Sequence, residues 1–135
     1  SLGDRMGDLS GINNTGATSF VQHAAATAIR DGEEFVTEMV ERCRRGRDLV
    51  HQRLGGMDRI KLASPKAAFY AFPQIEGLKD DLEFAKYLVR EHRVGLAPGS
   101  AFGPDNDGFL RLCFAKSEEQ LSAAMDRIEA GLKNL

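Results

Sequence analysis

Apolar side chains recur at helical spacing in several stretches of the chain. In residues 33–54 they stand at intervals of four, three, seven and four, at Val36, Val40, Cys43, Val50 and Leu54. Such intervals place apolar side chains on one face of an α-helix. The stretch therefore predicts a long amphipathic helix, which ends at the pair Gly55 and Gly56.

Three shorter helices are predicted by capping-box patterns, in which a polar residue is followed three positions later by Glu or Gln. The pairs are Ser19 with Gln22, Asp80 with Glu83, and Ser117 with Gln120. They introduce helices over residues 20–30, 82–92 and 118–132.

Strand-type runs lie between these helices. Residues 59–64 (RIKLAS) and 67–75 (AAFYAFPQI) are short extended runs that predict an antiparallel pair. Residues 94–97 and 109–115 flank the glycine-rich loop PGSAFGPDNDG and predict two further strands. Residues 1–18 are polar and glycine-rich, and we expect an irregular N-terminal arm there.

Strands in this number cannot cover both of their own faces, whereas three or four helices can cover one. The predicted fold class is therefore α/β (α+β), a two-layer arrangement. We expect a small mixed sheet of about four strands with helices packed mainly on one face.

One charged residue interrupts the last strand. In GFLRLCFA the period of two places Leu110, Leu112 and Phe114 on one side and Phe109, Arg111 and Cys113 on the other. Leu110, Leu112 and Phe114 are suited to pack on the helices, so Arg111 should point to the opposite face of the strand. Phe109 and Cys113 make that face more apolar than a surface exposed only to water. An arginine in a strand is more often an edge residue that reaches solvent. A guanidinium that binds a carboxylate is the alternative.

Composition narrows the classes of function. The 135 residues carry a formal net charge of −2, which gives no overall attraction for nucleic acid or an anionic membrane. Cys43 and Cys113 form no CxxC pair, and the three histidines have no metal-ligand spacing, so we expect a reducing, cytoplasmic setting and no metal site. No signal peptide and no membrane-spanning run is evident, and we expect a soluble protein.

Three segments in a fixed order carry a resemblance: PKAAFYAFP, then VGLAPGSAFG, then GFLRLCFA. From about residue 17 to the end, the chain resembles the C-terminal part of a fold-type I, pyridoxal phosphate (PLP) dependent class I/II aminotransferase. The resemblance implies that residues 19–135 are the small domain, and that Arg111 binds the α-carboxylate of the substrate. The whole enzyme would transfer an amino group between an amino acid and a 2-oxo acid. Family members are usually homodimers, and Asn13, Asn14 and Thr15 resemble the stretch that runs near the neighbouring subunit.

The chain also departs from the family pattern. None of its lysines has the context of the family's cofactor lysine. The aspartate that pairs with the pyridine nitrogen and the region that seats most of the phosphate are missing as well. The resemblance therefore implies a fragment with no catalytic residue, no cofactor-binding residue and no bound PLP, inactive by itself. Ala67 replaces a frequent glycine, and its methyl either narrows the substrate pocket or is merely tolerated.

Two other interpretations stay open. Relatives of the same fold type include PLP lyases, which share this domain. A stand-alone α/β module that binds a small carboxylate through Arg111 is the alternative from a different class. The sequence upstream of Ser1 would separate a fragment from a module.

Overall fold

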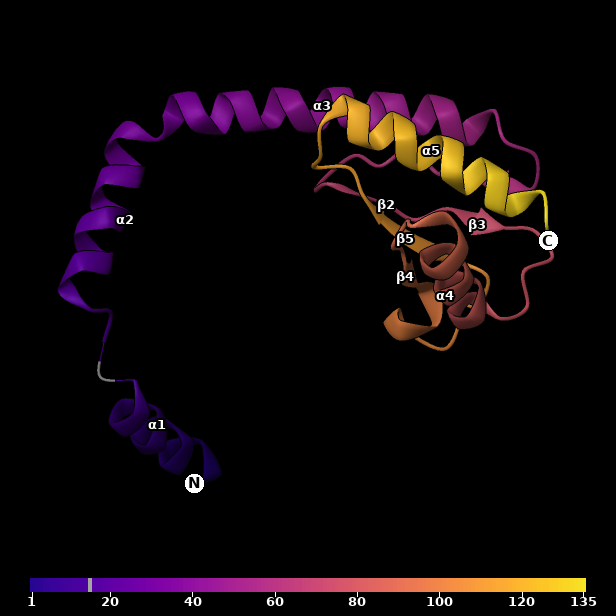
Figure 1. Ribbon diagram of the computed structural model, residues 1–135. Coiled ribbons are helices and arrows are strands. Elements are labelled where there is room, and N and C mark those ends of the chain that lie inside the picture. Colours follow the sequence, from indigo (N-terminus) through magenta and orange to yellow (C-terminus); the bar gives the residue numbers. More distant parts are fainter. Residues whose placement is uncertain (15) are drawn as a thin grey trace. The chain divides into compact units, whose positions relative to one another are not determined.

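The computed structural model describes residues 1–14 and 16–135 (Figure 1). Its elements in chain order are α1 (Leu2–Asn13), α2 (Ser19–Asp31), α3 (Glu33–Gly55), β1 (Ile60–Lys61), β2 (Tyr70–Ala71), β3 (Gln74–Ile75), α4 (Asp81–His92), β4 (Ala97–Pro98), the 3₁₀ turn η1 (Gly99–Phe102), β5 (Leu110–Cys113) and α5 (Glu118–Leu132). The chain divides into two compact units, which we call the N-terminal unit (Ser1–Glu38) and the C-terminal unit (Met39–Leu135). The long helix predicted over residues 33–54 is confirmed as α3.

The N-terminal unit begins with a helix. The expectation of an irregular arm over residues 1–18 is wrong for Leu2–Asn13, which forms α1. A capping box between Ser1 and Asp4 starts this helix. Its apolar residues Leu2, Met6 and Leu9 follow at helical spacing, a pattern that the intervening glycines obscured.

Helix α2 begins close to its predicted position but with a different cap. Thr18 is the N-cap residue, and its side chain makes no capping hydrogen bond. Gln22 does not complete a box with Ser19; instead its side-chain amide donates to the carbonyl of Ala17 at 2.7 Å. Asn13 is the last residue of α1 and Asn14 its C-cap, whereas Thr15 lies outside the described residues. The resemblance of this stretch to a subunit-contact segment stays a prediction.

The C-terminal unit contains the strands. Strand β5 lies at the centre of a three-stranded antiparallel sheet in the order β2-β5-β4, and β1 pairs with β3 in a second antiparallel sheet. All described strand pairs are antiparallel, so the expectation of one mixed sheet of about four strands is wrong in this detail. The run 67–75 is divided because Pro73 has no N–H to donate to a neighbouring strand. Its second half, β3, forms the predicted pair with β1.

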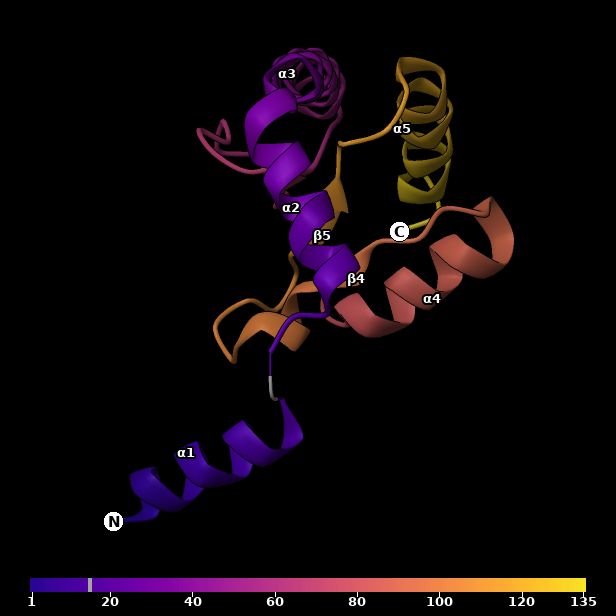
Figure 2. The same ribbon diagram turned by 90° about the vertical axis from the view of Figure 1, so that its left-hand side faces the viewer.

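The core lies between the sheets and three helices. Leu110, Leu112 and Phe114 are at most 3% exposed, and they pack with buried residues of α3, α4 and α5, such as Leu54, Leu88 and Met125. Figure 2 shows α4 and α5 on the same side of β4 and β5. The α+β class with helices on one face is thereby confirmed.

Helices α3 and α5 run parallel to each other. Arg45 pairs with Glu118 at 2.9 Å near one end, and Arg53 pairs with Asp126 at 2.5 Å further along. These ion pairs are exposed and contribute little to stability. The close approach depends on Gly46, where an added Cβ would lie 2.5 Å from the carbonyl oxygen of Phe114 and 3.1 Å from Leu121.

Candidate functional site

Arg111 occupies the middle of the central strand. Its backbone pairs with Ala97 of β4. Arg111 is half-buried, whereas its sequence neighbours Leu110 and Leu112 are buried. Because neighbouring side chains on a strand point to opposite faces, Arg111 lies on the face away from the helices. This placement agrees with the alternation seen in the sequence.

Two aromatic rings enclose the guanidinium. The Cζ atom of Arg111 is 4.4 Å from the ring centroid of Tyr70, on β2, and 4.3 Å from that of Phe102, in η1. Each cation–π contact of this kind contributes about 0.5–1 kcal/mol at an exposed site. Both contacts are made by the π faces of the rings, so they use none of the N–H donors, which lie in the plane of the guanidinium.

No ion pair neutralises this charge within residues 1–14 and 16–135. The charged partners found for other arginines of the C-terminal unit, such as Glu118 for Arg45 and Asp126 for Arg53, have no counterpart at Arg111. Its contacts are with aromatic rings, which leave the N–H donors unused. A guanidinium arranged in this way can bind a carboxylate through two parallel hydrogen bonds.

The same face is covered by further aromatic side chains. Phe72 stacks on Phe109 with ring centroids 5.0 Å apart, and it meets Phe102 edge to face at 6.0 Å. We call Tyr70, Phe72, Phe102 and Phe109 the aromatic face. Its apolar atoms lower the local dielectric around Arg111, which strengthens any ion pair formed there.

The sequence indicated only part of this arrangement. The period of two placed Phe109 and Arg111 on one side, and the same period in AAFYAFPQI would have placed Tyr70 beside Phe72. Phe102 gave no such signal, because it belongs to a loop without periodicity. Its contact with Arg111 arises from the folding of η1 against β5.

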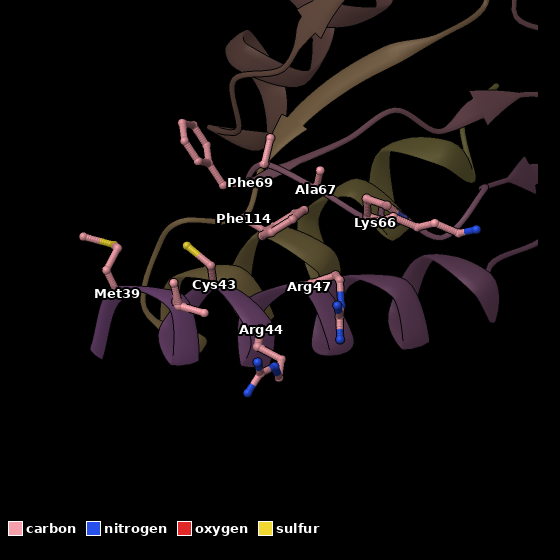
Figure 3. A pocket seen from close by; sticks show the side chains of 11 residues that line it. Met39, Cys43, Arg44, Arg47, Lys66, Ala67, Phe69 and Phe114 are labelled. Carbon is pink, nitrogen blue, oxygen red and sulfur yellow. The ribbon is translucent and has the colours of Figure 1, made fainter. Parts of the chain in front are cut away.

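A separate cavity lies beside α3. It has a volume of about 450 Å³ and is lined by Met39, Val40, Cys43, Arg44, Arg47, Pro65, Lys66, Ala67, Ala68, Phe69 and Phe114. Figure 3 shows the guanidinium groups of Arg44 and Arg47 directed away from Phe69 and Phe114. Ala67, which replaces a frequent glycine of the family it resembles, contributes to this cavity.

The lysines of the chain bear on whether it could hold PLP. Every lysine of the chain is exposed, whereas a lysine that holds an aldehyde cofactor must be desolvated or otherwise activated. Among the described residues, no cluster of His, Cys, Asp or Glu has the arrangement of a metal site. The helices in the described part of the chain are too short or too polar to cross a membrane. Cys43 and Cys113 are free thiols.

The family model and the relatives that match this chain are all aminotransferases. A family model described as "Aminotransferase class I and II" matches residues 2–128. The chain is 42% identical over 125 residues to aromatic-amino-acid aminotransferase 2 of Thermococcus litoralis, covering 90% of this chain and 32% of that protein. It is 41% identical over 125 residues to an aspartate aminotransferase of Pyrococcus abyssi, with the same coverage.

The fold of this chain also matches part of a solved aminotransferase structure. The crystal structure of an aromatic aminotransferase from Pyrococcus horikoshii superimposes with a TM-score of 0.86 at 37% identity, over 97% of this chain and 36% of that one. The chain thus spans about a third of the length of the relatives it matches.

Proposed function

Because the chain belongs to the class I and II aminotransferase family, we propose that it is the C-terminal part of a PLP-dependent aminotransferase. Residues 19–135 provide the small domain, and the whole enzyme transfers an amino group between an amino acid and a 2-oxo acid. The relatives named above act on aromatic amino acids or on aspartate, and side-chain selectivity is left to the remainder of the enzyme.

The observation that carries this proposal is the enclosed but unneutralised guanidinium of Arg111. An α-carboxylate is common to amino acid and 2-oxo acid, so one arginine serves both substrates. The rings of Tyr70 and Phe102 contact the guanidinium through cation–π interactions, which leave its N–H donors to the carboxylate. Arginine stays charged at every physiological pH, so binding needs no proton transfer at this residue.

The cofactor belongs to another part of the enzyme in this proposal. In this family, PLP supplies the electron sink for amino transfer. The exposed lysines of the chain do not fit its site, so we assign this chain no catalytic and no cofactor-binding residue. We further propose a cytoplasmic homodimer. Two free thiols agree with a reducing compartment.

A substitution series at Arg111 in the full-length enzyme tests the proposal. Arg111→Ala should weaken binding of the amino acid and the 2-oxo acid by about 2–5 kcal/mol, as expected when one partner of a buried, hydrogen-bonded charge pair is removed. Arg111→Lys should be nearly as damaging, because an ammonium cannot donate two parallel hydrogen bonds. Arg90→Ala, at an exposed arginine of α4, serves as the matched control. Unchanged substrate affinity in both Arg111 variants would refute the assignment.

Two simpler experiments address the fragment. Sequencing the coding region upstream of Ser1 should reveal a lysine motif for PLP; a start codon directly before Ser1 would favour the stand-alone carboxylate-binding module.

The chain alone, mixed with PLP and an amino acid, should transaminate no faster than free PLP, as followed by 2-oxo acid formation. Turnover above that background would contradict the proposal that the PLP site belongs to another part of the enzyme.

A further inference from the structure

A buried carboxylate, that of Asp81, contacts the turn η1, which carries Phe102. Among the described residues, Asp81 is the one charged side chain in the buried class, at 5% exposure. It is the first residue of α4, where the helix N-terminus favours a negative charge. A buried charge is costly unless it is hydrogen-bonded, so its partners indicate what it does.

Both partners of Asp81 are on one residue of η1. Its Oδ2 accepts the backbone N–H of Ser100 at 2.6 Å, and its Oδ1 accepts the Ser100 hydroxyl at 2.9 Å. Hydrogen bonds to an ionised acceptor are stronger than those between neutral groups. Asp81 therefore ties the start of the turn to α4.

The rest of the turn is tied to its own loop and to β5. The backbone N–H of Gly99 donates to the carbonyl of Phe109 at 2.8 Å, and the side-chain amide of Asn106 donates to the carbonyl of Phe102 at 3.1 Å. Gly99 has no room for a side chain, since a Cβ there would lie 2.7 Å from that of Phe109. The turn is held closely, and Asp81 provides its charged anchor.

Phe102 lies two residues after Ser100 and covers one side of the Arg111 guanidinium. Tyr70, the other ring in contact with the guanidinium, is fixed by the pairing of β2 with β5, opposite Cys113. Phe102 has no strand to hold it. Its place over Arg111 therefore depends on η1 and on its edge contact with Phe72. The bonds between Asp81 and Ser100 are the charged part of what holds η1.

We propose that Asp81 and Ser100 are positioning residues, which set the orientation of the Arg111 guanidinium by fixing Phe102 over it. The proposal rests on the proposed function, in which Arg111 binds the substrate carboxylate. A stacked guanidinium donates only in its own plane, so the two rings determine the direction from which a carboxylate is accepted. Loosening η1 lets the plane tilt and lowers carboxylate affinity without removing any charge from Arg111.

The first test reads the orientation directly in this chain. In an NMR spectrum of the ¹⁵N-labelled chain, the rings of Tyr70 and Phe102 should shift the Nε–Hε signal of Arg111 by their ring currents. Asp81→Asn should move that signal toward the value of a free arginine, because an amide places an N–H₂ group against one of the two Ser100 donors. Ser100→Ala should move it less, and Ser100→Thr should restore it.

Asp80→Asn is the matched control. Asp80 is the neighbouring N-cap, and its side chain accepts the N–H of Glu83. Asparagine caps a helix as well as aspartate does. The same loss of charge at Asp80 should leave the Arg111 signal in place. If Asp81→Asn and Ser100→Ala also leave the Arg111 signal at its original position, the proposal is overturned.

The second test uses the full-length enzyme and a mutant cycle. Asp81→Asn should raise KM for the amino acid about 10-fold, with a smaller change in kcat, since misplacement of a substrate-binding group is costly even from a distance. Phe102→Leu should have a similar effect. The double variant should be no worse than Phe102→Leu alone, because Asp81 acts through that ring.

The two proposals fail separately. Additive losses in the double variant would show that Asp81 acts by another route, even if Arg111 binds the carboxylate. Conversely, if Arg111→Ala leaves KM unchanged, the carboxylate role is wrong, while the NMR signal of Arg111 still reports whether Asp81 positions it.

Discussion

The two units of the chain have similar helices but opposite burial. In the N-terminal unit, neither α1 nor α2 has a buried residue; Phe20 is 74% exposed and Ile29 is 87% exposed. In the C-terminal unit, Leu88 and Met125 are fully buried on helices of comparable length. An amphipathic sequence therefore forms a helix in both units, but only in the C-terminal unit do the described helices bury apolar side chains.

The difference indicates where each unit obtains its stability. Isolated helices shorter than about 12–15 residues are marginal in water, and most helical stability in proteins comes from packing of the apolar face. The C-terminal unit packs its helices on its own sheets, whereas the apolar residues of α1 and α2 face solvent.

Hydrogen exchange should show the largest contrast. Amides of α1 and α2 should exchange with almost no protection, because no burial opposes their opening. Amides of β5 and the middle of α5 should open only with the whole unit, so their protection factors should be at least about 1,000-fold higher. Native-state exchange followed by NMR measures both in one sample. Equal protection in the two units would mean that α1 and α2 have packing partners within the chain.

A pair of phenylalanine substitutions tests the same contrast by side chain. Phe114 is 1% exposed, and Phe114→Ala should lower the free energy of unfolding by about 3–5 kcal/mol. Phe20→Ala removes the same atoms from an exposed site and should change it by less than about 0.5 kcal/mol. Urea unfolding of both variants decides the matter. A large loss at Phe20 would contradict the separation of the units.

The sequence predicted the elements whose signals are local and periodic. Helix α3 followed from its apolar intervals, and the N-cap of α5 followed from Ser117 and Gln120, whose reciprocal hydrogen bonds are present. The inward and outward sides of β5 followed from the period of two. In each case, neighbours in sequence are also neighbours in the structure.

The remainder depends on contacts between distant segments. Helix α1 is the exception, because its capping box between Ser1 and Asp4 is a local signal that the glycines of the segment concealed. The division of β2 from β3 reflects pairing with two different strands, β5 and β1. Phe102 contacts Arg111 from a turn that hydrogen-bonds to Asp81, 19 positions before Ser100. Spacing in the sequence carries no information on such approaches.

Two glycines of α3 sharpen the contrast within one helix. Gly46 faces Phe114 and Leu121 so closely that Gly46→Ala should destabilise the C-terminal unit by about 1–3 kcal/mol, as overpacking of a core does. Gly55 has nothing within 4 Å of an added Cβ. Gly55→Ala should be neutral or stabilising by up to about 1 kcal/mol, because alanine favours the helix. Thermal unfolding of both variants gives the comparison, and a stabilised Gly46→Ala would show that α3 and α5 can separate without cost.

The smallest effect concerns the first turn of α5. The hydroxyl of Ser117 and the backbone N–H of Glu119 both donate to the Glu119 carboxylate, and they hold the pKa of that carboxyl below its ordinary value. When folding lowers the pKa of a carboxyl, the ionised carboxylate stabilises the folded state at pH values above the unfolded pKa. This stabilisation is lost as the pH falls through the folded pKa.

Acidification should therefore loosen the first turn of α5. The rest of α5 should stay in place, because Leu121 and Met125 fix that part of the helix to the core. A ¹³C titration of the Glu119 carboxyl should show a midpoint below the ordinary glutamate value, and Ser117→Ala should raise that midpoint. If the whole of α5 loosens together at the Glu119 midpoint, packing does not hold this helix, and the contrast between the two units is smaller than burial indicates.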